Sequence, residues 1–154
     1  MKADNKDFTS ENTELEQLDA IGRVAWAWDR FGEDLVVSTS FGLQSAVMLH
    51  LVSKVNKEIP IIFVDTGYLF PETYQYAETL CEKLGIRPKT FSSGLSQAYQ
   101  EIRFGKLWEQ GAEGMERYNL MNKVEPMQRA LKEVNAKGWL SGLRRGQSES
   151  RADR

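Results

Sequence analysis

The chain has 154 residues, of which 41% are hydrophobic, and a formal net charge of −2 at pH 7. This length is sufficient for one domain with a substantial core. The slightly acidic balance argues against non-specific binding to nucleic acid. No apolar run reaches the length of a membrane span, and the polar start MKADNKDFTSEN is unlike a signal peptide. A single cysteine excludes an internal disulfide or a multi-cysteine metal site within this chain, so we expect a cytoplasmic protein.

The first residues are polar, and we expect residues 1–12 to form a flexible N-terminal tail. A single α/β nucleotide-binding domain is expected over residues 13–154. Its first element is a helix, because apolar residues recur at helical spacing from Thr13 to Phe31. Gly32 is the expected end of that helix.

The stretch LVVSTSFGLQS, residues 35–45, combines features of an anion site. Its apolar start predicts a strand buried on both faces, and small hydroxyl residues and Gly42 follow. The next apolar residues predict a helix that continues to about Val55, with an apolar face made of Leu43, Ala46, Val47 and Leu51. The first N–H groups of a helix have no internal partner, and the helix dipole adds positive charge there. The stretch therefore predicts a phosphate or sulfate cradle, although an ordinary strand-to-helix turn explains it equally well.

A second apolar run, Pro60–Val64, predicts another buried strand, which ends at Asp65–Gly67. Pro71 then suits the first turn of a helix that buries one apolar face and ends at Gly85. Strands that alternate with helices predict a parallel sheet, and ligands of such sheets bind beyond the carboxyl ends of the strands. Because Ser38–Gly42 and Asp65–Gly67 both lie at such ends, the cradle becomes the better interpretation.

The rest of the chain predicts weaker elements and a basic tail. They are an edge strand at 86–91, a short helix at 96–104, a loop-rich segment with helical pieces at 105–122, a helix at 125–137 and a short strand at 139–142. The last twelve residues hold several arginines among glutamine and serine. Guanidinium groups suit bidentate phosphate or sulfate contacts. A solvated, frayed end is the alternative, which composition alone favours.

Five motifs resemble, in this order, those of the phosphoadenylyl-sulfate (PAPS) reductase, assimilatory sulfonucleotide reductase family. They are STSFGLQSAVMLHL at 38–51, DTGYLFPETY at 65–74, GKLWEQGAEGMERYN at 105–119, NKVEPMQRAL at 122–131 and GLRRGQSESRA at 142–152. The resemblance implies a Rossmann-like parallel sheet flanked by helices, the adenine nucleotide α-hydrolase-like (PP-loop) fold. It also implies thioredoxin- or glutaredoxin-dependent reduction of PAPS to sulfite and adenosine 3′,5′-bisphosphate in sulfate assimilation, commonly by homodimers.

The resemblance also implies three groups of substrate-binding residues. The family's modified PP-loop corresponds to Ser38, Thr39, Ser40, Phe41, Gly42 and Ser45. The next strand end and two lysines supply Asp65, Thr66, Gly67, Lys106 and Lys123. The family's basic substrate-binding motif corresponds to Gly142, Arg144, Arg145, Gln147, Ser148 and Arg151. Because of that last match, a substrate-binding role for the arginine-rich tail is preferred over a solvated, frayed end.

Two departures from related patterns narrow the expected chemistry. ATP pyrophosphatases carry an aspartate where this chain has Gln44, so a carboxylate that could help to hold Mg²⁺ on ATP is missing. The iron–sulfur branch of the family, which reduces adenylyl sulfate, has adjacent cysteines where this chain has Tyr118 and Asn119. A four-cysteine cluster cannot form from one cysteine. We therefore expect no metal and no iron–sulfur cluster, and the PAPS-using branch is preferred.

The family's nucleophile is a cysteine in a C-terminal Glu-Cys-Gly-Leu-His motif, which we expect beyond Arg154. The domain is accordingly expected to be truncated at its C-terminus. Cys81 lies on the predicted apolar face of a helix, where a buried thiol is a poor nucleophile. His50 lies in an apolar helical run and is interpreted as structural. We therefore expect this chain to bind the nucleotide without turning it over.

Two alternatives remain open beside a PAPS reductase. One is an AMP-forming PP-loop ATPase or the ATP-binding subunit of a sulfate adenylyltransferase, against which Gln44 argues. The other is a non-catalytic module that binds a nucleotide or a partner protein. Preference among adenosine 3′,5′-bisphosphate, AMP and ATP separates these possibilities.

Overall fold

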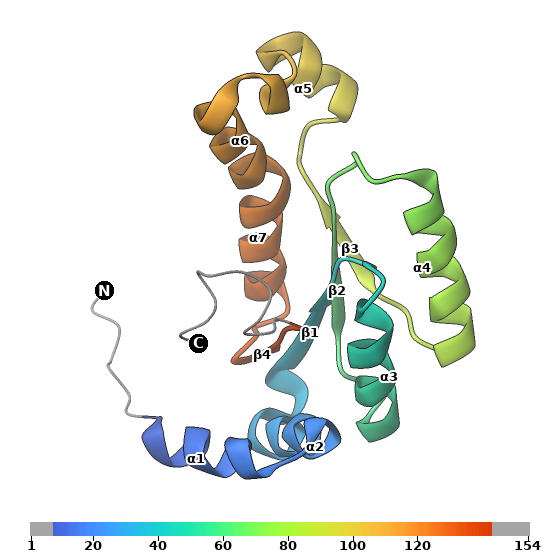
Figure 1. Ribbon diagram of the computed structural model, residues 1–154, viewed down its shortest axis with the longest axis vertical. Helices are drawn as coiled ribbons and strands as arrows, with labels where there is room; N and C mark the ends of the chain where they lie inside the picture. Colours follow the sequence, from blue (N-terminus) through green and yellow to red (C-terminus); the bar gives the residue numbers. More distant parts are fainter. Residues whose placement is uncertain (1–7, 143–154) are drawn as a thin grey trace.

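The fold is described from a computed structural model over residues 8–142, and its elements are drawn in Figure 1. The helices are α1 (Thr9–Gln17), α2 (Ala20–Phe31), η1 (Gly32–Asp34), α3 (Ser45–Val55), α4 (Pro71–Leu84), α5 (Gln97–Phe104), η2 (Leu107–Glu109), α6 (Gly111–Asn119), η3 (Leu120–Val124) and α7 (Glu125–Glu133). The strands are β1 (Leu35–Thr39), β2 (Ile61–Asp65), β3 (Lys89–Ser92) and β4 (Gly138–Leu140). No helix within these residues has the length and apolar character needed to cross a membrane.

The four described strands form one sheet in the order β3-β2-β1-β4, and all three pairings are parallel. Val37 lies opposite Ile61 on one side and Leu140 on the other, so β1 is a central strand. The prediction of a parallel sheet is therefore confirmed. Because the strands are parallel, the carboxyl ends of β1, β2 and β4 meet at one edge of the sheet.

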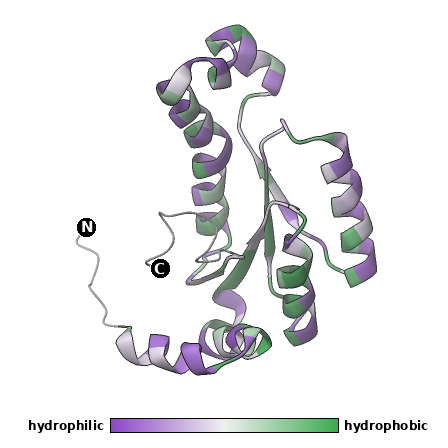
Figure 2. Cartoon of the chain, in the orientation of Figure 1, coloured by the Kyte–Doolittle hydropathy of each residue, from purple (hydrophilic) through white to green (hydrophobic). Residues whose placement is uncertain are grey.

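Hydrophobic residues cover both faces of the sheet, as two-sided burial of the strands predicts. Leu35 and Val37 belong to one core cluster with residues of α2, α3 and α4. Val36, which points to the opposite face, packs with Ala130 of α7. Figures 1 and 2 show this arrangement, with α3 and α4 on one side of the strongly hydrophobic strands β1 and β2 and α7 on the other.

At the N-terminal end, two helices replace the single helix that apolar spacing predicts. The break falls at Leu18 and Asp19, where the Asp19 carboxylate caps α2 by accepting a hydrogen bond from the Gly22 N–H at 2.8 Å. Gly32 ends α2 with φ of 53°, as expected. Helix α1 already begins at Thr9, so the expected boundary between tail and domain falls inside this helix.

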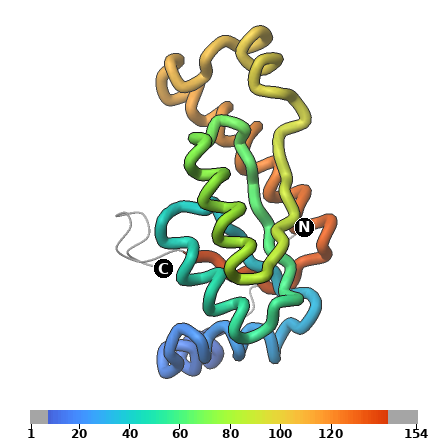
Figure 3. Tube along the Cα trace, turned by 90° about the vertical axis from the view of Figure 1, so that its right-hand side faces the viewer, coloured from blue at the N-terminus to red at the C-terminus, as the bar shows by residue number. Residues whose placement is uncertain are grey.

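The segment predicted as loop-rich with helical pieces, residues 105–122, is largely helical. The helical pieces are confirmed, but the loop-rich character is wrong. Its glycines suggest loops, but a Cβ on Gly114 would come within 2.1 Å of the Leu107 carbonyl oxygen, so this glycine allows a close approach inside helical structure. Helix α7 ends at Glu133, short of the predicted residue 137, and Asn135 follows with φ of 52°. Figures 1 and 3 show α5 and α6 at one end of the molecule, with α1 and α2 at the other.

Strand β3 occupies the sheet edge, as predicted, but it begins at Lys89 and not at Ile86. Pro88, which immediately precedes it, lacks the N–H that a paired strand residue donates. The short helix predicted from Ser96 is confirmed, since the Ser96 hydroxyl caps α5 by accepting from the Tyr99 N–H at 3.3 Å.

Candidate functional site

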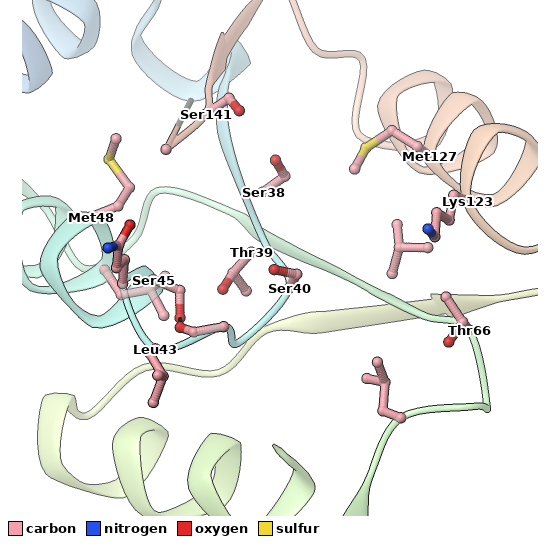
Figure 4. A pocket seen from close by; sticks show the side chains of 16 residues that line it. Ser38, Thr39, Ser40, Leu43, Ser45, Met48, Thr66, Lys123, Met127 and Ser141 are labelled. Atoms are coloured by element: carbon pink, nitrogen blue, oxygen red, sulfur yellow. Dashed lines mark hydrogen bonds between the residues drawn. The ribbon is translucent and has the colours of Figure 1, made fainter. Parts of the chain in front are cut away.

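An open pocket of about 800 Å³ lies at the edge of the sheet where the parallel strands end. Its lining comes from the ends of β1, β2 and β4, the start of α3, and the helix formed by η3 and α7. The lining residues are Ser38, Thr39, Ser40, Gly42, Leu43, Gln44, Ser45, Met48, Leu49, Val64, Thr66, Leu69, Lys123, Met127, Ser141 and Gly142. Figure 4 shows Lys123 and Met127 on one side, Ser45 and Met48 on the other, and Ser38–Ser40 between them.

The turn between β1 and α3, where the sequence predicts a cradle, lines the pocket. Gly42 is exposed, and its carbonyl accepts hydrogen bonds from the Ser45 N–H at 2.8 Å and the Ser45 hydroxyl at 2.6 Å. Within residues 8–142, no hydrogen bond uses the N–H groups of Gly42, Leu43 or Gln44. Donors of this kind at the start of a helix attract anionic oxygens.

Phe41 supports this turn from the core side and lies outside the pocket lining. Its side chain is only 3% exposed and packs edge-to-face on Phe63, with ring centroids 5.0 Å apart. Its backbone has φ of 51°, and its N–H donates to the Thr39 hydroxyl at 3.1 Å. The ring therefore anchors the loop to the core. Phe41, which the sequence predicts as a substrate contact, supports the turn and does not line the pocket.

The turn after β2 contributes only Thr66 to the lining among its three predicted residues. The Asp65 carboxylate instead accepts hydrogen bonds from the Gly67 N–H and the Tyr74 hydroxyl, both at 2.7 Å. Burial first, and then this hydrogen bond to Asp65, raise the pKa of Tyr74 to about 12. Asp65 and Gly67 thus shape the loop that presents Thr66.

The two predicted lysines occupy different environments. Lys123 lines the pocket, and its ammonium lies 5.5 Å from the centroid of the Tyr118 ring. None of the ion pairs found within residues 8–142 includes Lys123. Lys106 lies outside the lining and pairs with Glu109 at 3.6 Å on the surface. The structure therefore brings only Lys123 together with the cradle.

The end of β4 completes the pocket beside β1. Ser141 and Gly142 are lining residues, and the Trp139 indole N–H donates to the Ser38 hydroxyl at 2.8 Å. The remaining predicted contacts lie outside the described residues: Arg144, Arg145, Gln147, Ser148 and Arg151.

Several lining residues are missing from the predicted site, and most of them are apolar: Leu43, Gln44, Met48, Leu49, Val64, Leu69, Met127 and Ser141. The predicted apolar face of α3 is wrong in part, because Leu43 is 91% exposed and Val47 is 64% exposed, whereas Leu51 packs against the core. The helix starts at Ser45, and its buried residues are Leu49 and Val52. In the sequence, only the positions of some of these residues could have indicated a place in the pocket. Val64 directly precedes the polar end of β2, and Leu43 and Gln44 directly precede α3.

The single cysteine of the chain does not contribute to the pocket. Cys81 lies on α4, packs against the core and is not a lining residue. Burial, with a smaller effect from Glu78, raises the pKa of its thiol, which lowers its reactivity. His50 is exposed on α3, in contrast to the structural role expected for it. Within residues 8–142, no group of three or more histidine, cysteine, aspartate or glutamate residues is arranged to hold a metal.

A parallel sheet with a pocket at its carboxyl edge is the arrangement found in α/β proteins of the nucleotide-binding kind. The family model described as "phosphoadenosine phosphosulfate reductase domain" matches residues 34–154. The chain therefore belongs to the phosphoadenosine phosphosulfate reductase domain family, and its α/β architecture is the PP-loop-like adenine nucleotide α-hydrolase fold.

Two kinds of relatives agree with this assignment. The chain is 58% identical over 142 residues to phosphoadenosine 5′-phosphosulfate reductases of Escherichia coli O139:H28 and Shigella flexneri, covering 92% of this chain. It spans 58% of the length of these relatives. The crystal structure of PAPS reductase from Candida auris in a phosphate complex matches with a TM-score of 0.80 and 29% identity, covering 96% of this chain and 71% of that one.

Proposed function

We propose that this chain is the nucleotide-binding part of an enzyme that reduces PAPS to sulfite and adenosine 3′,5′-bisphosphate, with thioredoxin or glutaredoxin as electron donor. The observation that carries the proposal is the meeting of three kinds of donor at one pocket: the amides of residues 42–44, the strand-end hydroxyls and Lys123. Within residues 8–142, these amides make no hydrogen bond and this lysine makes no ion pair. These are donors that suit phosphate and sulfate oxygens. Family membership and the names of the bacterial relatives support the substrate.

We propose that the lining hydroxyls and amides bind the anionic end of the nucleotide. The hydroxyl-bearing residues are Ser38, Thr39, Ser40, Ser45 and Thr66. The apolar lining residues, such as Met48, Val64 and Leu69, provide a surface suited to a flat base. Lys123 adds positive charge, and the predicted arginine-rich motif would add more. We further propose that residues 13–154 belong to a single domain.

The proposed reaction needs a thiolate that attacks the sulfur atom and displaces adenosine 3′,5′-bisphosphate. Donors in the cradle would stabilise the negative charge that accumulates on this leaving group. No cysteine lines the pocket, and Cys81 packs against the core, so the thiol must come from outside the described pocket. We therefore propose that this chain by itself binds the nucleotide and does not turn it over.

We further propose a cytoplasmic location and a homodimeric full-length enzyme. A single cysteine, which allows no internal disulfide, supports the location. The homodimer rests on the family resemblance alone. Sedimentation of the full-length enzyme would test it, and a monomer at micromolar concentration would contradict it.

Thermal unfolding with adenosine 3′,5′-bisphosphate, AMP and ATP, each with and without Mg²⁺, tests the proposed function. We expect the bisphosphate to stabilise the chain most, by about 2.7 kcal/mol at a hundredfold excess over Kd. Gln44 lines the pocket as an amide, so Mg²⁺ should not strengthen ATP binding. Preference for ATP together with Mg²⁺-dependent release of pyrophosphate would support the ATPase alternative, and no response to any nucleotide would contradict nucleotide binding.

A further inference from the structure

Lys123 lies within an unusual stretch of helix. Residues 120–124 form a π turn, in which the N–H of Glu125 donates to the carbonyl of Leu120, five residues earlier. The backbone on both sides stays helical, so α6, η3 and α7 form one continuous helix (Figure 1). π turns within α-helices are uncommon and occur frequently at functional sites. Here the turn contains Lys123, while Met127 lies four residues further along the same side of the pocket (Figure 4).

The residue before this lysine takes part in a buried amide pair. Asn122 is 0% exposed and Gln100 of α5 is 2% exposed. Their side-chain amides bond reciprocally, with Gln100 donating to Asn122 at 2.9 Å and Asn122 donating to Gln100 at 3.0 Å. Gln100 also donates to the Leu95 carbonyl at 2.9 Å, and Asn122 donates to the Tyr118 carbonyl at 3.2 Å. The two reciprocal bonds connect the π turn to α5, and the bond to Tyr118 connects it to α6. The bond to Leu95 holds the Gln100 side chain against the segment that precedes α5.

We propose that the Gln100–Asn122 amide pair is a positioning device that holds the π turn so that Lys123 faces the pocket. The inference rests on the proposed function, in which Lys123 contacts an anionic group of the nucleotide. Adjacent residues of an α-helix point about 100° apart, and those of the wider π turn somewhat less. Fixing the Asn122 side chain against α5 therefore fixes the direction of the Lys123 side chain.

The surroundings of Lys123 favour this role over simple packing. Lys89, Lys106 and Lys137 each pair with a carboxylate, but no such pair within residues 8–142 includes Lys123. The Tyr118 ring lies 5.5 Å from its ammonium, and the carbonyl of the same tyrosine accepts from Asn122. The amide pair thus secures both the lysine and the ring beside it, while the positive charge stays available for a ligand.

A double-mutant cycle on the 154-residue chain tests the proposal, with affinity for adenosine 3′,5′-bisphosphate measured by calorimetry. Lys123→Met removes the charge but retains most of the apolar stem, and we expect a loss of roughly 10- to 100-fold in affinity. Q100M/N122L replaces both amides by apolar groups of similar volume, so neither amide is left without its partner, and the carbonyls of Leu95 and Tyr118 each lose one donor. We expect this double variant to lose affinity to a similar extent and Lys123→Met to cost almost nothing further in its background.

Lys132→Met is the matched control, because it removes an exposed lysine of the same helix that does not line the pocket. Its effect should be small in both backgrounds. If Lys123→Met costs the same factor with and without the amide pair, the positioning role is overturned while the proposed function stands. If wild-type chain does not bind the bisphosphate, the proposed function itself fails.

A second variant keeps the test decisive if Q100M/N122L loses its cooperative melting transition. Gln100→Asn retains both amides but shortens one side chain by a methylene, so the reciprocal bonds can no longer both keep their length. We expect affinity for the bisphosphate to fall while affinity for uncharged adenosine is retained. An equal fall for both ligands would indicate general damage to the pocket and would overturn the positioning role.

Discussion

The turns after β1 and β2 occupy equivalent places, since each joins the carboxyl end of a central strand to the start of a helix. In the first turn, the N–H groups of residues 42–44 take part in no hydrogen bond within the described residues. In the second turn, the Gly67 and Tyr68 N–H groups donate to the side chains of Asp65 and Thr66, at 2.7 and 3.2 Å.

The distribution of charged residues also makes the first turn more suitable for an anion than the second. No aspartate, glutamate, lysine or arginine occurs from residue 35 to residue 49, whereas Asp65 and Glu72 flank the second turn. Pro71 also removes one backbone donor from the start of α4. Under the proposed function, the position at a strand end is therefore not sufficient for an anion site. The donors must also remain unused, and the local charge must not repel the ligand.

The largest effect should come from closing the first turn with a negative charge. A Cβ on Gly42 would meet only the Ser40 hydroxyl oxygen, at 3.6 Å, so a larger side chain fits without strain. Gly42→Asp should lower affinity for adenosine 3′,5′-bisphosphate by about 100-fold or more, because like charges cost several kcal/mol at close range. Calorimetric titration measures the loss, and the melting temperature should change little.

Gly94→Asp is the control for this substitution, because Gly94 is exposed and a Cβ added to it would have no atom within 4 Å. It adds the same charge away from the pocket lining. Equal losses of affinity in the two variants would show that net charge, and not the cradle, governs binding.

Opening the second turn should affect stability more than binding. Asp65→Ala leaves the Gly67 N–H and the Tyr74 hydroxyl without their acceptor, so we expect a loss of about 1–3 kcal/mol in the free energy of unfolding. Asp65→Asn retains one acceptor oxygen and should lose less. Urea denaturation measures both variants, and a stability unchanged by Asp65→Ala would show that the closed turn does not depend on this carboxylate.

Burial of Tyr74, together with its hydrogen bond to Asp65, predicts a pH dependence. Tyr74 has its pKa raised from 10.0 to about 12 in the folded chain, so the folded state favours the neutral phenol. The associated stabilisation is complete below pH 10 and disappears as the pH rises through 12. Unfolding followed between pH 9 and 12 should show this loss, and it should be smaller in Asp65→Ala. An identical pH profile in the two proteins would contradict the assignment to Tyr74 and Asp65.

Sequence reasoning located the first turn well because its signals are local. A continuous apolar run, small hydroxyl residues and a glycine follow one another directly, and the sheet order then brings Thr66 beside them. The buried face of α3 was harder to predict from the sequence. Leu43 is apolar, but it precedes the helix and stays exposed. Spacing alone does not reveal where a helix begins when the preceding turn is also apolar.

The other wall of the pocket could not be derived from local patterns. Nothing in the sequence around Gln100 and Asn122 indicates that these polar residues are buried. Only the tertiary structure shows that their side chains are paired and buried. The glycines of residues 105–114 suggested loops, but Gly114 is needed for close packing against Leu107. Lys106 and Lys123 had equal standing in the sequence, and only the fold separates them.

The smallest predicted effect concerns the orientation of one hydroxyl beside the first turn. The Trp139 indole can only donate, so its bond to Ser38 uses an acceptor lone pair and leaves the serine proton free to point elsewhere. A serine held in this way is prepared to donate to an anion in the pocket. Trp139→Phe should therefore weaken bisphosphate binding by about two- to tenfold, the range for one neutral hydrogen bond.

Ser38→Ala provides the background that makes this prediction specific. If Trp139 acts through the Ser38 hydroxyl, Trp139→Phe should have almost no effect on affinity once that hydroxyl is gone. Trp139 is 50% exposed, so the replacement by phenylalanine should leave the core intact. Equal losses in the wild-type and Ser38→Ala backgrounds would mean that the indole contributes by contact with the ligand. The first turn would then depend on its own backbone donors alone, without help from β4.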